Sequence, residues 1–579
     1  MAASVYYDGD CPFCDRYVSL LRLQETVGPV DLVDLRSHPA LVAELNEQGF
    51  SLDKGMVLDV DGRRIGGADA MHQLALLSTP STNFNRLNKW IMSNAFLARF
   101  LYPLLRMGRW CALFFMGREQ MSSDDVGVRA RSTTFASLFA LFSVFHFFNY
   151  LLEYARFPVE WDMLLIIFSA VLLFIRPQSS RLLWLLMFTS TLSAISQAPV
   201  QSNHTIVRNF VLLGYWMSFF YALIRNLRWS DIFSNFTTAG QGSLIVMYFF
   251  GVFHKINSDF LNPETSCAVT LWREMPKPLS LIDNPAMHYL AIYGTFAVEG
   301  ILIAMLFYRR TRHLAVVGGI LFHLLLALSN YAMYISFTTL AIALHCLFLN
   351  EESALKIQSS SFMKTIKARI TDPIYFVFAI ILIIMLTVAG FLREYTIVTL
   401  LMMPILLPFC YGIIRYGVSS KPLLGPDVRR SSNTIGIILT TVFFVNCWAP
   451  YLGLKSAQTI NMFANIRLEA GVSNHVIMRS PPGPFKYLDD VVTIDDPQGA
   501  KRFNFRNSED YGVVYYELLS HLADNPGTKI SYTRNGVAYE DMTAEKLASE
   551  IKNTLHPKWF RKWFHFKRVE LKQPEACGL

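Results

Sequence analysis

A single lysine closes a long apolar run in YFFGVFHKINSDFLNP, residues 248–263. Ionisable side chains at membrane depth are costly, so Lys255 at the mouth of such a run is a candidate functional residue. Desolvation can hold a lysine partly neutral, which is the form that accepts a proton. The alternative is a snorkelling lysine that only anchors the end of a helix.

Two cysteines near the N-terminus have the spacing of a redox pair, Cys11-Pro12-Phe13-Cys14. They follow a predicted strand and precede a helical pattern. In such an arrangement the helix N-terminus stabilises the thiolate of the first cysteine, and the second cysteine resolves a mixed disulfide. A zinc site would need two further ligands, which His38 alone does not supply. We therefore predict redox chemistry, with a structural or vestigial pair as the alternative.

Composition indicates an integral membrane protein with extramembrane parts, because 53% of the 579 residues are hydrophobic. The net charge of +8 fits basic loops at a membrane surface. No basic run lies in a recognisable nucleic-acid-binding fold, so nucleic acid is not an expected partner. Apart from the one pair, the eight cysteines are scattered, which argues against a secreted disulfide framework. The opening residues MAASVYYDGD predict no cleavable signal peptide.

Residues 1–118 are predicted to form a soluble α/β domain. Its order is strand, cysteine pair, helix, strand and helix, then a strand pair that turns at Asp61-Gly62. The predicted segments are the strand Ser4–Asp8, a helix carrying Tyr17, Leu20, Leu21 and Leu23, the strand Val30–Leu35, the helix Pro39–Glu47, the strand pair Gly55–Gly67 and a helical region Asn85–Gly117.

The segment YYDGDCPFC, with Asp8 three residues before Cys11, resembles the DCC family of thiol-disulfide oxidoreductase domains. GRRIGGADAMHQLALL and the helical region that follows it resemble the same family. The resemblance implies a thioredoxin-like fold in which Cys11 is the attacking thiol, Cys14 the resolving thiol and Asp8 a nearby acidic group. Cellular thiol reductants are the expected partners of the pair.

Apolar runs of roughly bilayer-spanning length recur within residues 130–452, the predicted transmembrane domain. There are eleven, of which the second and fifth are short enough to be re-entrant or tilted. They are 133–155, 160–176, 182–198, 206–224, 242–256, 287–308, 313–329, 331–349, 373–391, 396–414 and 433–451. With a cytoplasmic N-terminal domain, the inner loops hold fifteen lysines and arginines and the outer loops four. This asymmetry predicts that the cysteine pair is cytoplasmic and that Lys255 and the C-terminal domain lie on the opposite face.

Four polar residues in or beside these runs are further candidates. Asn203 and His204 open one run, whereas Glu299 and His323 lie within consecutive runs and could pair with each other. The alternative for each is a hydrogen bond that only joins two helices. No two histidines have metal-ligand spacing on one helix, so no metal is expected.

The membrane domain resembles the vitamin K-dependent gamma-carboxylase family, whose bacterial relatives carry the horizontally transferred transmembrane (HTTM) domain. GVFHKINSDF is similar to the segment of the family's catalytic-base lysine, here Lys255, and FHLLLALSNYAMYISF to its catalytic histidine helix, here His323. NHTIVRNF is similar to its Asn-His segment, and Glu299 stands where the family carries a carboxylate. One departure is His254, because the family often has a second lysine at this place.

The resemblance implies that Lys255 is the general base toward a reduced naphthoquinone, a vitamin K-type hydroquinone, which O2 converts to an epoxide. The strongly basic oxygen species formed on the way would take a proton from a glutamyl residue, and the carbanion would take up CO2. His323 would position the quinol or stabilise developing charge. The residues implied to bind substrate are Asn203, His204, Asp259 and Glu299. The expected partners are membrane lipid, quinone and a glutamate-containing peptide or protein.

Residues 453–579 are predicted to form an extramembrane α+β domain, which resembles the lumenal region of the same family. The predicted segments are the strands Asn474–Met478, Asp490–Ile494 and Lys529–Thr533, the helices Tyr511–Ala523 and Ala544–Leu555, and a hairpin turn at Asn535-Gly536. The basic and aromatic stretch KWFRKWFHFKRVEL fits either a membrane-interface segment or a helix end with a closing edge strand. Cys577 has no predicted partner.

The sequence thus predicts a polytopic α-helical membrane bundle of about eleven spans, with an N-terminal thioredoxin-like α/β domain and a C-terminal α+β extramembrane domain. The leading function is a gamma-carboxylase-like enzyme, a lyase that couples quinol epoxidation to glutamyl carboxylation, with an attached thiol-disulfide oxidoreductase module. The first alternative is a membrane thiol–quinone oxidoreductase without carboxylation. The second is a non-enzymatic transport or lipid-binding bundle, although the sequence shows no repeat or broken helix pair of the transporter kind.

Overall fold

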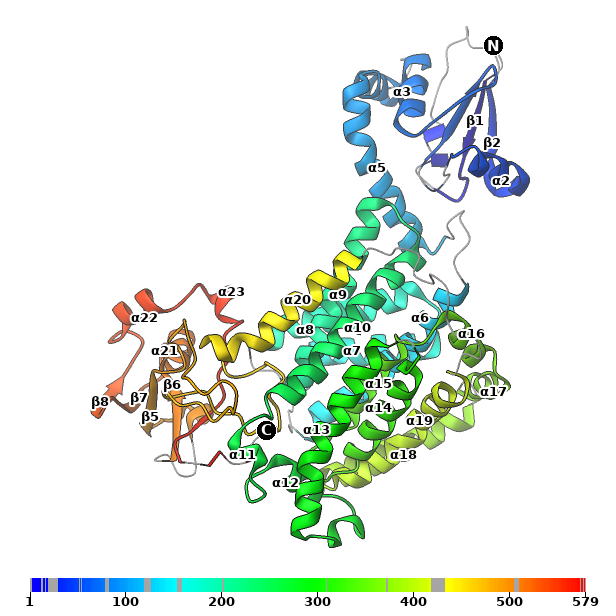
Figure 1. Cartoon of the computed structure of the whole chain (residues 1–579). Helices are drawn as coiled ribbons and strands as arrows, with labels where there is room; N and C mark the ends of the chain where they lie inside the picture. The colour runs from blue at the N-terminus through cyan, green and yellow to red at the C-terminus, as the bar shows by residue number, and fades with distance from the viewer. Residues whose placement is uncertain are drawn as a thin grey trace. The chain divides into compact units, whose positions relative to one another are not determined.

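The computed structural model describes most of the chain (Figure 1). The described residues are 3–118 without 12, 13, 16, 19–29, 51, 52, 54 and 79–82, then 126–153, 159–199, 202–308, 310–370, 373–417, 433–504, and 510–577 without 573 and 576. The chain divides into two compact units. The first unit consists of Met1–Arg129 and Trp216–Ser234, and the second consists of Ala130–Tyr215 and Asn235–Leu579. The division into three domains stays a prediction.

A four-stranded sheet forms the core of the first unit, in the order β2-β1-β3-β4. Strand β1 (Ala3–Tyr7) pairs in parallel with β2 (Val30–Asp34) and antiparallel with β3 (Val57–Val60), which forms a hairpin with β4 (Arg63–Gly66). The hairpin turns at Asp61 (φ 51°) and Gly62 (φ 82°), as a two-residue turn with two left-handed positions requires. The predicted order of the strands along the chain is confirmed. The predicted helix after Cys14 lies largely outside the described residues.

Helices of the first unit cover this sheet and extend beyond it. They are the 3-10 helix η2 (Leu35–Ser37), α2 (Pro39–Glu47), α3 (Gly67–Leu77), α4 (Asn83–Met92) and α5 (Ala95–Met116). The predicted helical region Asn85–Gly117 is divided into two helices, α4 and α5. The Asn94 side chain caps the N-terminus of α5, because it accepts hydrogen bonds from two backbone amides of its first turn. Trp110 Nε1 donates to the Leu227 carbonyl at 2.8 Å, which explains why residues 216–234 belong to this unit.

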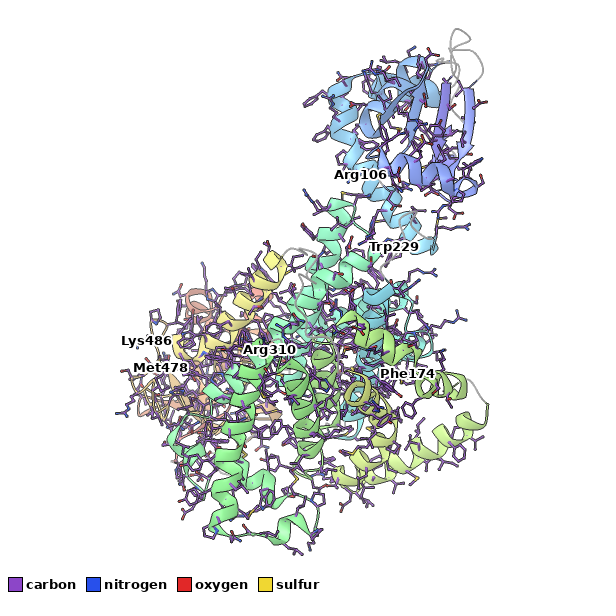
Figure 2. All side chains as sticks on the ribbon, turned by 45° about the vertical axis from the view of Figure 1, so that its right-hand side comes forward. Arg106, Phe174, Trp229, Arg310, Met478 and Lys486 are labelled. Carbon is purple, nitrogen blue, oxygen red and sulfur yellow. A yellow bond between two sulfur atoms is a disulfide. The ribbon has the colours of Figure 1, made fainter. Side chains whose placement is uncertain are left out.

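Each of the eleven predicted apolar runs overlaps a helix of the structure. These helices are α6 (Val126–Leu152), α7 (Trp161–Ile175), α8 (Ser180–Gln197), α9 (Asn203–Arg225), α10 (Trp229–Phe253), α13 (Pro285–Phe307), α14 (Arg312–Leu326), α15 (Ile335–Cys346), α18 (Pro373–Phe391), α19 (Tyr395–Tyr416) and α20 (Asn433–Trp448). Shorter elements lie between them: α11 (Ser258–Leu261), α12 (Cys267–Arg273), η4 (Leu279–Leu281), α16 (Glu351–Ser359), α17 (Ser361–Ile370) and η5 (Ala449–Leu452). Figure 2 shows the side chains that fill the spaces between the helices of this bundle.

Six helical segments of the described chain are long and apolar enough to cross a membrane, and four more are apolar but shorter. The six are α6, α9, α10, α13, α19 and Thr434–Leu452. The chain is therefore a helical membrane protein, and a total of eleven spans stays a prediction. Helix α10 starts thirteen residues before the predicted run, because polar residues of its first half are accommodated inside the bundle. Asn235 is buried, and Gln241 Nε2 donates to the Leu347 carbonyl at 2.9 Å.

The C-terminal part of the second unit is built on a five-stranded antiparallel sheet, in the order β8-β7-β5-β6-β9. Its elements are β5 (Val491–Asp496), η6 (Lys501–Phe503), β6 (Tyr511–Val514), α21 (Tyr515–Asp524), β7 (Ile530–Arg534), β8 (Val537–Met542), α22 (Ala548–Thr554), α23 (Lys558–Arg561) and β9 (Val569–Glu570). The predicted turn at Asn535-Gly536 is confirmed by two positive φ angles, 52° and 77°.

Two predicted elements of this part are wrong. Residues 474–478 form no strand and contribute one bridge, between His475 and Asn257. The predicted helix at Tyr511 begins as strand β6, because Val513 and Val514 are buried as the sheet continues from β5. The helix α21 then starts at Tyr515.

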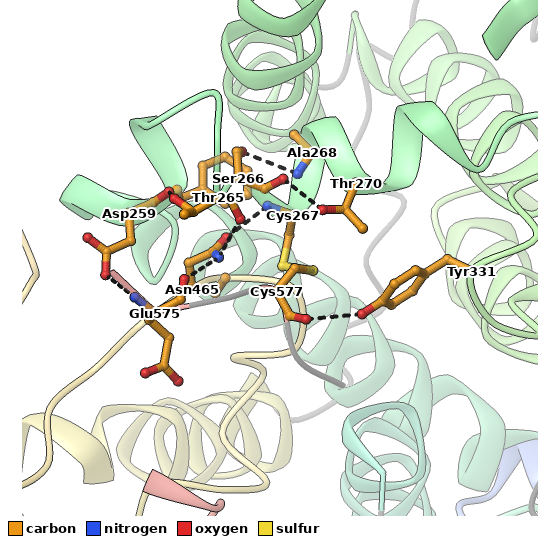
Figure 3. Close-up of a disulfide and its surroundings, with 12 residues drawn as sticks. Asp259, Thr265, Ser266, Cys267, Ala268, Thr270, Tyr331, Asn465, Glu575 and Cys577 are labelled. Carbon is orange, nitrogen blue, oxygen red and sulfur yellow. Dashed lines mark hydrogen bonds between the residues drawn. A yellow bond between two sulfur atoms is a disulfide. The ribbon is translucent and has the colours of Figure 1, made fainter. Parts of the chain in front are cut away.

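A disulfide joins Cys577 to Cys267, so the expectation that Cys577 lacks a partner is wrong (Figure 3). The two cysteines are 310 residues apart in sequence, which no local pattern reveals. Cys267 is the first residue of α12, and its backbone N–H donates to Asn465 Oδ1 at 2.9 Å. Asn465 in turn donates to the Glu575 carbonyl, while Tyr331 donates to the Cys577 carbonyl at 3.1 Å. The disulfide therefore fixes the C-terminal segment to the bundle.

Replacing Cys577 with serine should lower the thermal midpoint of the detergent-solubilised protein. Loss of a disulfide that closes a long loop typically costs about 2–4 kcal/mol. The measurement is a melting curve followed by intrinsic fluorescence, with Cys111→Ser, a half-buried free thiol on α5, as the control. A reductant should lower the midpoint of the wild type and leave that of Cys577→Ser unchanged. A peptide map of the unreduced protein in which the two cysteines are alkylated separately would contradict the assignment.

Candidate active sites

An apolar cavity of about 330 Å³ lies in the second unit among α9, α10, α12, α13, α14 and the segment 460–463. Most of its lining is aliphatic or aromatic. Its polar lining residues include Asn203, His204, Tyr248, Lys255, Thr295, Glu299 and His323. Leu290 and Leu325 also line the cavity and are 60% and 47% exposed, so the cavity reaches the outer surface of α13 and α14.

An ion pair between Lys255 and Glu299 is the most strongly interacting feature of the cavity. Lys255 follows the end of α10 by two residues, and its Nζ lies 2.9 and 2.8 Å from Glu299 Oε1 and Oε2. Both residues are buried, at 9% and 8% exposure. Gly251 on α10 lies beside the pair, because a Cβ there would be in ordinary van der Waals contact with Glu299 Oε2 at 3.4 Å. The predicted pairing of Glu299 with His323 is wrong. Opposite charges attract far more strongly in a low-dielectric site than a carboxylate and a neutral ring.

His323 belongs instead to a chain of hydrogen bonds through Tyr248. The Tyr248 hydroxyl lies 2.9 Å from His323 Nε2 and 3.2 Å from His345 Nε2. His345 Nδ1 lies 2.7 Å from the Ala341 carbonyl, which only accepts, so His345 Nδ1 donates and its Nε2 accepts from Tyr248. With neutral rings, His323 Nε2 must then donate to Tyr248, which leaves His323 Nδ1 as an acceptor. This buried nitrogen has no hydrogen-bond partner in the described part of the chain.

Asn203 and His204 also line the cavity, and each contacts a different part of the chain. Asn203 Oδ1 accepts from the Ile460 backbone N–H at 2.9 Å and so holds the 460–463 segment at the cavity. His204 Nε2 lies 3.4 Å from His146 Nδ1 on α6. His254, at the departure from the family pattern, is fully buried between the Tyr451 hydroxyl and the Thr459 carbonyl, both at 2.8 Å.

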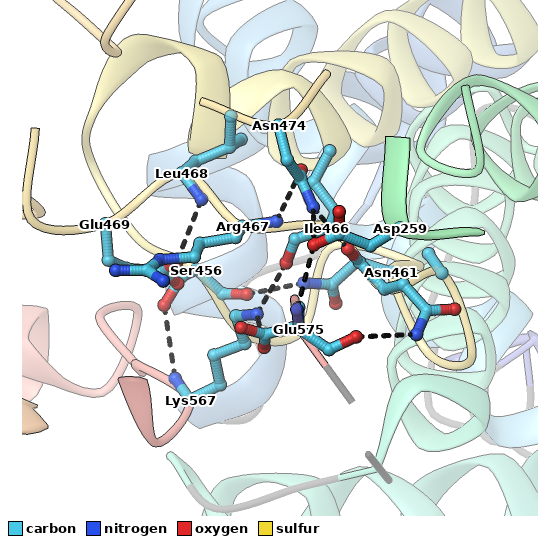
Figure 4. Close-up of polar contacts among 12 residues, drawn as sticks. Asp259, Ser456, Asn461, Ile466, Arg467, Leu468, Glu469, Asn474, Lys567 and Glu575 are labelled. Carbon is cyan, nitrogen blue, oxygen red and sulfur yellow. Dashed lines mark hydrogen bonds and ion pairs between the residues drawn. The ribbon is translucent and has the colours of Figure 1, made fainter. Parts of the chain in front are cut away.

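Asp259 does not line the cavity, in contrast to the prediction that it binds substrate. Its Oδ2 accepts from Asn474 Nδ2 and from the Glu575 backbone N–H, both at 2.9 Å (Figure 4). Lys567 Nζ lies 2.7 Å from Glu575 Oε1 in the same network. Asp259 Oδ1 accepts from the Ser258 hydroxyl at 2.7 Å. The contacts of Asp259 Oδ2 therefore hold the C-terminal segment.

The cysteine pair forms a second site, in the first unit. Cys11 and Cys14 are both buried, and the Cys14 backbone N–H donates to Cys11 Sγ at 3.2 Å. The hydrogen bond with Cys11, together with burial, raises the pKa of the Cys14 thiol well above its ordinary value. Cys14 is therefore held as a thiol, which suits a resolving cysteine and leaves Cys11 as the sulfur that is stabilised by donors.

Asp8 forms buried ion pairs with two arginines beside this pair. Arg109 Nη2 lies 2.6 Å from Asp8 Oδ2, and Arg36 Nε lies 2.8 Å from Asp8 Oδ1. Burial opposes the charge on Arg109, but the charges of Cys14, Asp8 and Cys11 raise its pKa. Arg109 is only 6% exposed and comes from α5, where Leu113, one turn on, packs in the same core as both cysteines. The site therefore contains a fixed cation, which favours a thiolate.

Comparison with known families assigns each site to a domain. Residues 5–112 match the model of the DCC1-like thiol-disulfide oxidoreductases, and residues 228–353 match that of the HTTM domain. The chain joins a DCC1-like thiol-disulfide oxidoreductase domain to an HTTM domain. The first match contains the cysteine pair and Arg109, and the second contains Lys255, Glu299 and His323. No curated protein and no solved structure matches the chain.

Sequence reasoning missed four residues of these sites. Arg36 and Arg109 lie 28 and 101 residues from Asp8, and an arginine in a helical pattern carries no sign of such a contact. Tyr248 lies seven residues before Lys255, which is two helical turns along the same face, so helical spacing could have placed it near the lysine. His345 lies in an apolar run, as several other histidines do, and had no distinguishing signal.

Replacing Arg109 with methionine should slow alkylation of the reduced cysteine pair at pH 7 about three- to tenfold, because the thiolate loses its buried cation. The rate of iodoacetamide addition, followed by mass spectrometry against pH, should show a profile displaced to higher pH. Arg109→Lys should restore most of the rate.

The matched control is Arg99→Met on the same helix, whose partner Asp69 is exposed. Equal rates and equal pH profiles for the two methionine variants would exclude this role for Arg109.

Proposed function

We propose that the HTTM domain oxygenates a membrane hydroquinone to its epoxide, with Lys255 as the base. The observation that carries the proposal is the buried Lys255–Glu299 pair at an apolar cavity that His323 also lines. A base in such a cavity suits a substrate that is apolar apart from an ionisable hydroxyl. The geometry gives both hydroxyls of a hydroquinone a potential partner, one at the lysine and one at His323.

Access from lipid supports this substrate class. The exposed side chains of Leu290 and Leu325 continue from the cavity lining to the outer surface of α13 and α14. Helix α13 is among the helices long and apolar enough to cross a membrane, and little of it is buried inside the protein. A quinone with an isoprenoid tail travels in the bilayer, so it would reach Lys255 without crossing water.

In the proposed reaction, the proton of the ion pair first passes from Lys255 to Glu299, so that Lys255 is a neutral amine. Lys255 then takes a proton from the bound hydroquinone and becomes an ammonium beside Glu299. One oxygen atom of O2 enters the epoxide and the other leaves as water. In the carboxylase form of the reaction, the γ-proton of a glutamyl residue is removed at the same time and CO2 adds to the carbon, which gives γ-carboxyglutamate. Exclusion of water from the apolar cavity would protect the strongly basic species on the way. The reduced naphthoquinone, O2, CO2 and a glutamate-containing peptide are the substrates that this proposal requires.

The topology proposed with this function has eleven spans, a cytoplasmic N-terminal domain and the C-terminal domain on the opposite face. The charge asymmetry of the loops supports it. The disulfide between Cys267 and Cys577 also fits a location outside the reducing cytoplasm.

A second candidate is a thiol–quinone oxidoreductase in which the cysteine pair performs the chemistry. The buried Arg109 cation beside Asp8 and the two cysteines favours it, because this arrangement prepares a reactive thiol. In this reading Cys11 and Cys14 supply two electrons to a quinone and become a disulfide, and the HTTM cavity only binds the quinone.

Turnover of a reduced naphthoquinone by the purified protein in lipid, with O2 supplied and epoxide detected by mass spectrometry, tests both candidates. We expect epoxide from the wild type and at least a hundredfold less from Lys255→Ala, in keeping with the loss of a general base. The control is Lys277→Ala, an exposed lysine before η4. Thermal midpoints of all variants separate loss of activity from loss of fold, because removing one member of a buried ion pair costs about 3–5 kcal/mol.

Equal epoxide from wild type and Lys255→Ala would exclude Lys255 as the base. Absence of epoxide, with quinone reduction that requires Cys11 but not Lys255, would favour the oxidoreductase. Incorporation of labelled CO2 into a glutamate-containing peptide is the additional measurement that decides whether carboxylation accompanies epoxidation.

A further inference from the structure

We propose that the segment from Lys558 to Trp563, which we call the aromatic-basic segment, docks on the lipid headgroups of the membrane that holds the bundle. The observation is the juxtaposition of two exposed tryptophans with the end of the apolar helix α8. The sequence KWFRKW combines two indole rings with three cationic side chains. Tryptophan concentrates at membrane interfaces, where one part of its ring is in apolar surroundings and its N–H is hydrated.

The large apolar side chains of this segment point away from the domain core. Trp559 and Trp563 are 71% and 57% exposed, and Phe560 is 37% exposed. By contrast, Tyr515, Tyr516 and Tyr532 of the same C-terminal region are each less than 5% exposed. Two adjacent exposed indoles are therefore unusual for this part of the fold and mark an interaction surface.

The backbone behind these indoles is firmly held. Arg561 Nη2 lies 2.8 Å from Asp524 Oδ1 at the end of α21, and Arg561 Nη1 lies 3.2 Å from Ser520 Oγ on the same helix. The Phe564 ring packs against Tyr516 and His556, with centroids 5.3 and 5.4 Å apart. The segment is thus anchored through one face, which fixes the tryptophans on the other.

The end of α8, the helix of the predicted run 182–198, lies directly beside the segment. Lys562 Nζ donates to the Ile195 carbonyl in the last turn of α8 at 3.0 Å. Pro199, just beyond α8, shares a small cavity with Phe564 and Phe566. The side chains of Phe188 and Ile195 on α8 are 39% and 59% exposed, so the outer surface of the helix is apolar up to its end. If α8 spans the membrane as the sequence predicts, the aromatic-basic segment lies where this span ends.

Charge favours lipid headgroups over an apolar protein partner. Lys558 and Lys562 flank the indoles, and Lys562 makes no ion pair among the described residues, since its contact at Ile195 is with a neutral carbonyl. An ammonium beside an indole at the level of headgroups can contact lipid phosphates while the ring inserts among the upper acyl carbons. An apolar protein surface would leave this charge without a partner.

Tryptophan quenching by brominated lipid tests the proposal on the full-length protein in nanodiscs. The chain has ten tryptophans, so the difference in emission between the wild type and Trp559→Phe/Trp563→Phe isolates the two residues. We expect lipid brominated near the headgroup to quench this difference emission at least threefold more than aqueous iodide does. Stronger quenching by iodide than by lipid would overturn the proposal, as would no quenching by either, which would mean that protein covers the rings.

A second measurement does not depend on the phenylalanine variants. Bimane attached to Trp559→Cys, in a background with Cys11, Cys14 and Cys111 changed to serine, should be quenched by nitroxide-labelled lipid. The matched control is bimane at Val537→Cys, a residue of β8 in the same domain that is 54% exposed. Equal lipid quenching at the two positions would exclude specific docking of the aromatic-basic segment.

Discussion

The Lys255–Glu299 ion pair is the interaction on which the HTTM cavity depends. A lone lysine among these apolar side chains would leave an uncompensated charge, so the carboxylate of α13 has to meet the residue that follows α10. The backbone beyond α10 is in turn held by the C-terminal part of the chain. Asn257 Nδ2 donates to the Ala464 carbonyl, and the Val476 N–H donates to the Ile256 carbonyl at 2.9 Å. The position of the lysine is therefore set jointly by the helices of the bundle and by the C-terminal part of the chain.

Both candidate sites contain buried charged groups that are compensated by partners of opposite charge. In the first unit, a buried carboxylate is compensated by two guanidinium groups, and the cysteine pair lies beside them. In the second unit, a buried ammonium is compensated by one carboxylate, with neutral histidines nearby. Each site thus keeps charged groups out of water at a fixed position, which is the condition for strong electrostatic control of a reacting atom.

Local patterns predicted the parts of these sites that are close in sequence. These parts include the cysteine spacing, the Asp-Gly and Asn-Gly turns, and the order of the strands of the first unit along the chain. Each follows from the backbone conformation that the local residue types favour. Contacts between side chains of different helices could not be predicted in this way. A hydropathy pattern indicates which residues face inward, but it does not indicate which residue of another helix each of them contacts. Glu299 could have met His323 or Lys255 on that basis. Asp259, placed by resemblance at the substrate, is instead used by the C-terminal segment, since its partners lie more than 200 residues away.

The two sulfur sites are in opposite oxidation states within one chain. Cys11 and Cys14 are free thiols, whereas Cys267 and Cys577 are joined. A purification buffer with a strong reductant would keep the first pair competent and open the second, releasing the segment that Asp259 and Tyr331 hold beside α12. A buffer without reductant would protect the disulfide and let the first pair oxidise in air. Preparations of this protein therefore differ in structure according to their thiol history, and an activity assay is interpretable only when the oxidation state of all four sulfurs has been counted.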